Sequence, residues 1–203
     1  MNRWRLLVLR DPDIGPHAET FDALLARTPP SGTVDYDLPQ PKWWFLQHLV
    51  RSGYLLHGSN ERAIEEFEPR PNFDAHNTNH VDAVFASDDA VWPLFFAVIK
   101  RPQSLINWCE HIPGASRYLF SIGSDPRDAA SWTTGAVYVL PCETFEPTPD
   151  SRELTSLVAV RPRARLTIEP GDFPCKGQTR GHRRGESVRS VWLRNLFRLP
   201  SPR

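Results

Sequence analysis

The sequence lacks any long hydrophobic run. A transmembrane helix needs roughly 20 consecutive apolar residues, and the apolar stretch within Met1–Arg10 is much shorter. This stretch is also too short for a secretory signal, and we expect it to form a first β-strand. The sequence therefore predicts a cytoplasmic protein with no membrane segment.

Cysteine and net charge are also scarce. The three cysteines, Cys109, Cys142 and Cys175, are odd in number and far apart, which disfavours a disulfide framework and fits a reducing compartment. The 24 Lys and Arg residues balance the 24 Asp and Glu residues. This balance excludes attraction of the whole chain to nucleic acid or to a membrane by net charge.

The short motifs that identify common catalytic and metal sites are absent. The chain has no Gly-x-Gly-x-x-Gly segment, no Gly-x-x-x-x-Gly-Lys-Ser/Thr loop, no Gly-x-Ser-x-Gly elbow, no Cys-x-x-Cys and no His-Glu-x-x-His. The segment Cys109–His111 offers one close Cys/His pair, which cannot fill a tetrahedral site. His76 and His80 lie in a polar stretch typical of a loop. We therefore expect no bound metal.

Among the features that are present, the 20 prolines indicate short elements and many fixed turns. Apolar periodicity predicts helices over 18–27, 41–51, 89–100 and 186–197, and a short helical turn over 63–67. Strands are expected over 54–58, 82–87, 117–122, 136–140, 157–160 and 165–168. Helices followed by many short strands, with few helical crossovers, favour an α+β fold.

The charge is unevenly distributed along the chain. We expect a single domain over residues 1–175, with a helical part over 1–52, and a basic tail over 176–203. The tail holds eight Lys and Arg residues against Glu186 alone, a local charge of +7. It is interpreted either as a solubilising end or as a contact for nucleic-acid phosphates, with Trp192 available for stacking.

The segment Tyr54–Asn60 carries the first functional hypothesis. An apolar strand ends in His57, and Gly58 and two small polar residues follow. A ligand can approach the backbone at Gly58 because no Cβ blocks it, and a rigid strand would position His57 well. The alternative is a strand-to-turn junction with an incidental histidine.

The segment Ala83–Asp88 is a second apolar strand that becomes polar at its end and leads into a helix. Together the two segments resemble the His-Tyr-Glu branch of the ADP-ribosyltransferase superfamily. The poly-ADP-ribose polymerases, the rifampin-modifying transferases and the tRNA 2′-phosphotransferases share this layout. The resemblance covers mainly residues 54–100. It implies an ADP-ribosyltransferase-like split antiparallel β-sheet with N-terminal helices, and NAD as the cofactor.

The resemblance also implies roles for individual residues. His57 would hydrogen-bond the nicotinamide-side ribose, and the Gly58 backbone would hold the nicotinamide amide. Phe85 stands where the family has tyrosine, so it could stack on the nicotinamide ring but lacks the hydroxyl. The remaining expected NAD contacts are Ser59, Asn60, Arg70 and Ser87.

Two of the implied roles have open alternatives. The family needs a carboxylate near a later strand, and Glu143, just past the strand over 136–140, is the nearest candidate. Its rivals are Glu110, Glu146 and Glu153, and Glu143 could equally cap the chain or face solvent. Arg70 could bind a pyrophosphate through its guanidinium, or it could pair with Glu66 or Glu68 at the surface.

These expectations lead to three hypotheses. The first is transfer of ADP-ribose from NAD to an acceptor that the sequence does not specify, or hydrolysis of NAD, with His57 and Glu143 as the catalytic pair. The second is a non-catalytic module that binds a nucleotide or a partner in the same cleft. The third is a nucleic-acid-binding protein that acts through residues 176–203.

Overall fold

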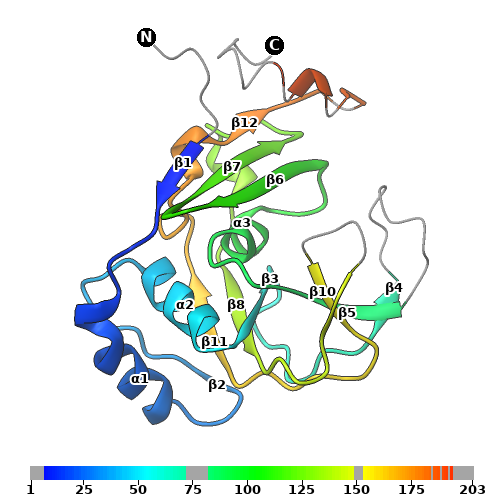
Figure 1. Cartoon of the computed structure of the whole chain (residues 1–203). Helices are drawn as coiled ribbons and strands as arrows, with labels where there is room; N and C mark the ends of the chain where they lie inside the picture. Colours follow the sequence, from blue (N-terminus) through cyan, green and yellow to red (C-terminus); the bar gives the residue numbers. More distant parts are fainter. Residues whose placement is uncertain are drawn as a thin grey trace.

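The computed structural model describes residues 7–71, 82–148, 153–183, 185–187, 189–191 and 193. They form an α+β fold in which two β-sheets lie on either side of a central helix, α3 (Trp92–Val98). Figure 1 shows the smaller sheet above α3 and the larger sheet below it. In the described part of the chain, no helix combines the length and the apolar character needed to span a membrane.

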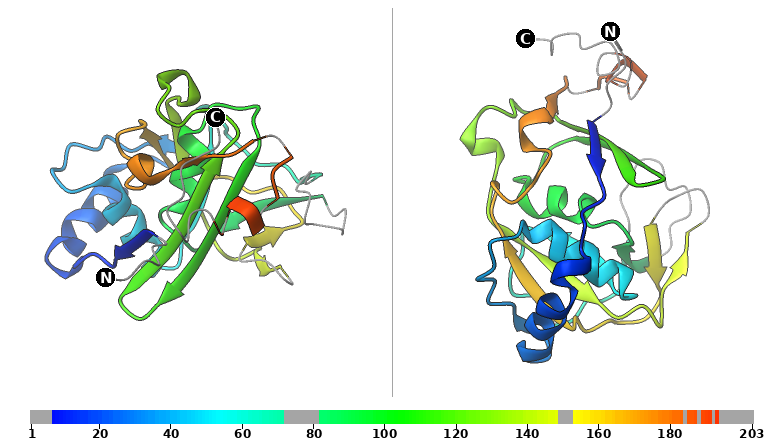
Figure 2. Two further views of the ribbon diagram at one scale, coloured as in Figure 1. Left: turned by 90° about the horizontal axis from the view of Figure 1, so that it is seen from above. Right: turned by 60° about the vertical axis from the view of Figure 1, so that its left-hand side comes forward.

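The small sheet is built around a hairpin of β6 (Leu105–Ile112) and β7 (Ala115–Ile122). Gly114 lies in the hairpin turn with φ 72°, a left-handed conformation that glycine adopts at little cost. On the other edge of β7 lie β1 (Leu7–Arg10), which is antiparallel, and β12 (Arg180–Gly181), which is parallel. Residues from both ends of the chain therefore complete this sheet (Figure 2).

The large sheet is antiparallel except for its first pair, β2–β11. In spatial order its strands are β2 (Gly32–Thr33), β11 (Ala164–Ile168), β8 (Gly135–Leu140), β3 (Leu55–Ser59), β5 (Asp82–Ser87), β10 (Glu153–Ser156) and β9 (Glu146–Pro147), and β4 (Arg70–Pro71) pairs with β5. The central strand β8 is buried along its whole length, which explains why it reads as a continuous apolar run.

Helix α3 fills the space between the sheets. Its Phe95 ring lies 4.7 Å from the ring of Phe120 on β7, and the opposite side of the helix packs on β3 and β8. Asp89 fixes the start of the helix, because its Oδ1 accepts the amide protons of Val91 at 2.7 Å and Trp92 at 2.6 Å. Pro93 is tolerated because it lies in the first turn.

Two further helices cover one flank of the molecule. Helix α1 (Ala18–Arg27) and helix α2 (Lys42–Arg51) pack together through Phe21 and Phe45, whose ring centroids are 5.7 Å apart. A second apolar cluster lies on the face of the large sheet that points away from α3. Its buried members include Phe67, Tyr138 and Phe145, so this sheet is covered on both faces.

Most expected elements are confirmed. Helices occur over 18–27 and 42–51, and strands occur at six of the seven expected places, including β1 at the start of the chain, most of them with shifted ends. The helix expected over 89–100 is shorter and spans Trp92–Val98. Residues Arg189, Ser190 and Val191, inside the C-terminal helix expected over 186–197, are helical. Of the polar stretch 71–80, expected to be a loop, Pro71 belongs to β4, and residues 72–80 lie outside the described residues, as do residues 1–6.

Two expectations were wrong, and β6 was not foreseen. The turn over 63–67 is not helical, because Phe67 instead forms an isolated β-bridge with Val160. The strand expected over 157–160 lies earlier, as β10, because the chain turns at Leu157 and Val158, which are 66% and 52% exposed.

The folded part of the chain continues past residue 175. Cys175 is fully buried, and Lys176 places its Nζ 5.3 Å from the centroid of the Trp132 ring. His182 is buried between two hydroxyls, with its Nδ1 2.9 Å from Ser121 Oγ and its Nε2 2.9 Å from Ser104 Oγ. The start of the predicted basic tail is therefore part of the small sheet and its surroundings.

Candidate functional site

The strands β3 and β5 separate almost as soon as they meet. They share one residue pair, Leu56 with Ser87, whereas β3 pairs with β8 along its whole length. The side chain of His57 bridges the opening, because its Nδ1 lies 2.7 Å from the backbone carbonyl oxygen of Phe85. A histidine side chain thus replaces the backbone hydrogen bonds that the diverging strands lose.

The surroundings of His57 fix its protonation. Burial lowers the pKa of the imidazole, the hydrogen bond to the Phe85 carbonyl opposes this shift, and the positive charge of Arg101 adds to it. The ring is therefore neutral at pH 7. Because a carbonyl oxygen can only accept, Nδ1 carries the proton and Nε2 is left as an acceptor. The ring of Phe67, 4.7 Å away, holds one side of the imidazole.

A pocket of about 690 Å³ opens beside this split, where β3 and β5 face α3 and the first residues of β6. Its volume falls within the range of small-molecule sites. The predicted site residues that line it are His57, Gly58, Ser59, Phe85 and Ser87. Residues remote in sequence, and predicted on separate motifs, are thus brought to one cavity.

Three predicted contacts do not line this pocket. The Asn60 amide instead donates to the carbonyl oxygens of Phe96 at 3.3 Å and Ala97 at 2.9 Å, and so holds the end of α3. Arg70 is exposed on β4, although the next residue of that strand lines the pocket. Glu143 is exposed in the turn after β8.

The carboxylate that does line the pocket belongs to Glu153, one of the rivals of Glu143. Glu153 begins β10 and lies directly opposite Ser87 of β5. Opposed residues of an antiparallel pair project from the same face of the sheet, so Glu153 shares the face of Ser87. Of the other two rivals, Glu110 forms an ion pair with Arg117 at 3.2 Å, and Glu146 is exposed on β9.

The pocket also holds polar residues that the sequence did not single out. They come from the segment between α3 and β6 and from β6 itself: Arg101, Gln103 and Asn107. The Arg101 guanidinium lies 5.1 Å from the centroid of the Phe96 ring. Burial lowers the pKa of Arg101, but a guanidinium remains charged at pH 7. The pocket therefore has a fixed cation near His57.

The glycine of the His-Gly-Ser segment has a packing role. A Cβ added to Gly58 would lie 1.8 Å from the backbone oxygen of Pro93, so α3 can approach β3 this closely only because residue 58 has no side chain. The nearby indole Nε1 of Trp92 is buried and has no hydrogen-bond partner among the described residues. Other atoms of Trp92 line the pocket.

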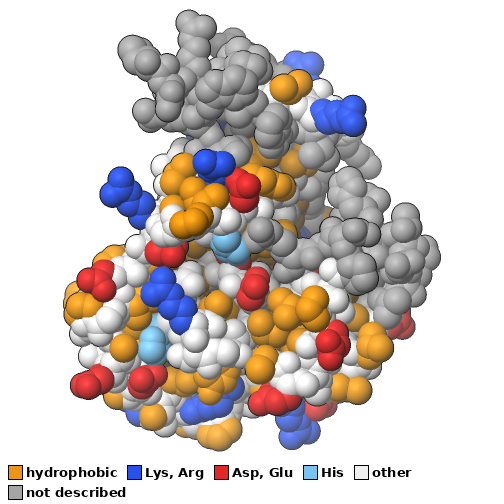
Figure 3. All heavy atoms as spheres, in the orientation of Figure 1, with side chains coloured by type: hydrophobic (Ala, Val, Ile, Leu, Met, Phe, Trp, Pro, Cys, Tyr) orange, Lys and Arg blue, Asp and Glu red, His pale blue; other side chains and the backbone are white. Residues whose placement is uncertain are grey.

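One face of the molecule carries no single sign of charge. On the face drawn in Figure 3, acidic and basic side chains of the coloured residues are interspersed with hydrophobic ones. This agrees with the zero formal net charge of the sequence.

Comparisons of the chain with models of known protein families, with curated proteins and with solved structures found no match.

Proposed function

We propose that the pocket binds NAD and that the chain transfers ADP-ribose from NAD to an acceptor, or to water, on an ADP-ribosyltransferase-like split sheet. The observation that carries the proposal is the convergence of His57, Gly58, Ser59, Phe85 and Ser87 on one cavity at a strand split. These five residues came from motifs about 30 positions apart in the sequence. A carboxylate, Glu153, lines the same cavity.

The neutral form of His57 suits a ribose. Its Nε2 can accept a hydrogen bond from a ribose hydroxyl while Nδ1 remains bound to the Phe85 carbonyl. Phe85, Trp92 and Phe96 give the cavity aromatic walls for a planar ring. Arg101, rather than Arg70, supplies the cation for the pyrophosphate, because it lines the pocket.

The chemistry breaks the bond between ribose C1′ and the nicotinamide nitrogen, and the electron pair leaves with nicotinamide. The nucleophilic atom of the acceptor forms the new bond to C1′, and its proton passes to a carboxylate or to water. Positive charge develops on the ribose as the bond breaks, so a carboxylate aimed at it stabilises the transition state. We assign this role to Glu153 in preference to Glu143.

The test incubates the full chain with NAD labelled in the adenylate part and measures free nicotinamide and labelled products. Glu153→Gln should lower kcat by roughly 10²–10³-fold, the usual effect of removing one electrostatic contact to the transition state. Glu143→Gln is the matched control and should leave the rate unchanged. If only Glu143→Gln lost activity, the carboxylate role would return to Glu143. If the native chain released no nicotinamide, the catalytic proposal would be wrong.

Phe85 favours a second candidate, nucleotide binding without turnover, since it lacks the hydroxyl of the tyrosine in the family that the motifs resemble. Calorimetry with NAD separates the two. Binding that requires His57, with no nicotinamide released, would identify a binding module. Failure of both binding and turnover would remove both candidates.

A further inference from the structure

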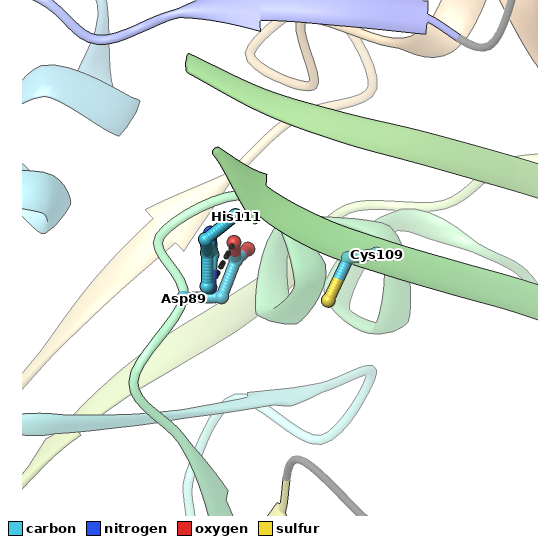
Figure 4. Close-up of side chains that lie close together, drawn as sticks. All are labelled: Asp89, Cys109 and His111. Carbon is cyan, nitrogen blue, oxygen red and sulfur yellow. Dashed lines mark ion pairs between the residues drawn. The ribbon is translucent and has the colours of Figure 1, made fainter. Parts of the chain in front are cut away.

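We propose that Asp89, Cys109 and His111, none of which lines the pocket described above, form a zinc site. This site is separate from the proposed NAD chemistry and reverses the expectation of no metal drawn from the sequence. The sequence shows Cys109 and His111 as an incomplete pair, and the fold adds the carboxylate of Asp89 from the segment that precedes α3 (Figure 4).

The three ligand atoms are already grouped. The carboxylate of Asp89, the Cys109 sulfur and a ring nitrogen of His111 all lie within 4.8 Å of one another. Cys109 and His111 are two residues apart on β6, so their side chains share one face of the strand. The Asp89 side chain is held beside them, because its Oδ1 accepts from the amides of Val91 and Trp92 and its backbone N–H donates to Ser87 Oγ at 3.1 Å.

The distance between Asp89 Oδ2 and His111 Nε2 suits two ligands of one metal ion better than it suits a direct hydrogen bond. His111 Nε2 lies 3.7 Å from Asp89 Oδ2, which is too long for a hydrogen bond. Two ligand atoms bonded at about 2.0 Å to a tetrahedral zinc ion are about 3.3 Å apart. Small side-chain movements would therefore bring both atoms to bonding distance of one ion.

Neighbouring hydroxyls hold two of the ligands in place. The Nδ1 of His111 lies 2.8 Å from Ser116 Oγ, which leaves Nε2 directed toward the cluster. The hydroxyl of Tyr118 donates to Asp89 Oδ2 at 2.7 Å. Metal-binding histidines and carboxylates usually have such outer partners, which fix their orientation.

Charge and exposure also suit zinc. A thiolate and a carboxylate neutralise the two charges of Zn²⁺, so the ion can lie among groups that are nearly buried. Asp89 is 2% and Cys109 5% exposed, whereas the His111 side chain is 39% exposed. Solvent therefore reaches one side, where water can complete the coordination. Sulfur and imidazole ligands favour zinc over magnesium or calcium.

The site would join both sheets. Ser87 and Asn107 line the pocket, and each lies two residues before a ligand, Asp89 or Cys109. The metal would therefore tie β6 of the small sheet to the segment after β5 of the large sheet. Since the folded chain holds the ligands together and the unfolded chain does not, binding must stabilise the fold.

The experiment titrates Zn²⁺ into the full chain after treatment with a chelator, and measures bound metal and Tm. We expect one ion per chain and a rise in Tm of roughly 5–10 °C at a hundredfold excess over Kd. Binding should weaken as pH falls, because the thiol must lose its proton. Co²⁺ should give a thiolate-to-metal absorption band. None of these measurements depends on NAD.

Two variants and a control decide the outcome. Cys109→Ser and His111→Gln should each weaken zinc binding by more than about 100-fold, since loss of an outer partner alone costs 10–100-fold. Cys142→Ser, which removes an exposed cysteine elsewhere, should bind zinc like the native chain. No binding by the native chain, unchanged binding in both variants, or equal loss in Cys142→Ser would overturn the proposal.

Discussion

At the scale of single residues, the properties of His57 are set by contacts from distant parts of the chain. Phe85 accepts from its Nδ1, Phe67 packs on its ring, and Arg101 adds a nearby positive charge. A histidine in such surroundings is held neutral and in one tautomer. Its protonation state follows from this environment rather than from the His-Gly-Ser segment alone.

The lowered pKa of His57 predicts a loss of stability in acid. Below about pH 6.5 the unfolded chain protonates this residue, while the folded chain resists protonation. The unfolded state then binds more protons, so the free energy of unfolding falls as pH drops through this value. We expect His57→Gln to reduce the difference in stability between pH 7.5 and pH 5, measured by urea unfolding. An equal difference in the two proteins would contradict the predicted pKa shift.

A second prediction at the residue scale concerns the contribution of Arg101 to NAD binding. If its guanidinium binds the pyrophosphate, Arg101→Gln should weaken NAD binding by roughly 10- to 100-fold, equivalent to the 1.5–3 kcal/mol of a hydrogen bond to a charged group. Arg70→Gln is the matched control, because Arg70 is exposed and does not line the pocket. Calorimetry measures both. A larger loss in Arg70→Gln would return the pyrophosphate role to Arg70.

At the scale of elements, the close packing of α3 on β3 shapes the pocket. Its tightest point is Gly58, where the helix backbone leaves no room for a side chain. A second point is Gly135 on β8, where an added Cβ would lie 2.1 Å from the backbone oxygen of Ala97. The helix can lie between the sheets only because both strands offer a flat surface.

Gly58→Ala should therefore move α3 away from β3. We expect it to lower the free energy of unfolding by about 1–3 kcal/mol or more, as overpacked cores do. Gly171→Ala is the control, because an added Cβ there would meet nothing within 4 Å. Chemical denaturation measures both variants. Full native stability in Gly58→Ala would show that the helix can shift without cost.

The end of α1 depends on a distant strand segment. Arg163 donates to the carbonyl oxygens of Thr28 at 2.9 Å and Leu25 at 2.8 Å at the end of the helix, where carbonyl groups lack the usual partners of a helix interior. The Leu25 oxygen also accepts the backbone N–H of Thr28 at 3.1 Å. Arg163→Met should cost about 1–3 kcal/mol of stability. Arg161→Met removes an exposed ion pair with Glu66 at 3.0 Å and should cost less than about 1 kcal/mol. Equal losses in thermal unfolding would count against this capping role.

At the scale of the whole molecule, the C-terminal segment completes the small sheet. β12 pairs with β7, His182 is buried, and Val191 is fully buried. A chain ending at Pro174 would lose these contacts together with the buried Cys175. The basic residues that begin the predicted tail thus belong to a structural segment as well as to a charged one.

We expect truncation after Pro174 to destabilise the protein strongly, since it removes a paired strand and several buried side chains. A chain that ends at Leu193 keeps every described contact and serves as the comparison. Circular dichroism and thermal unfolding of the two chains measure the difference. A chain ending at Pro174 that unfolds like the longer one would show that residues 175–193 add nothing to the fold.

The sequence by itself determined the local elements with strong periodicity. Helix α1 shows Phe21, Leu24 and Leu25 on one face, and all three are buried. The strands β3, β5 and β8 appear as apolar runs bounded by polar residues or glycine. The sequence did not predict β6, because Asn107, Glu110 and His111 interrupt its apolar residues. This strand is stabilised by its pairing with β7.

Only the tertiary structure decided which distant residues meet. Glu153 reaches the pocket through its pairing with Ser87, 66 positions earlier, and Asp89 joins Cys109 and His111 because β6 crosses the start of α3. Strand register and sheet packing are set by long-range contacts, which local periodicity does not record. The motifs therefore indicated His57 and Phe85, and they offered Glu153 and the Cys109/His111 pair only as candidates. The place of Arg101 in the pocket and of Asp89 beside Cys109 and His111 became visible only in the folded chain.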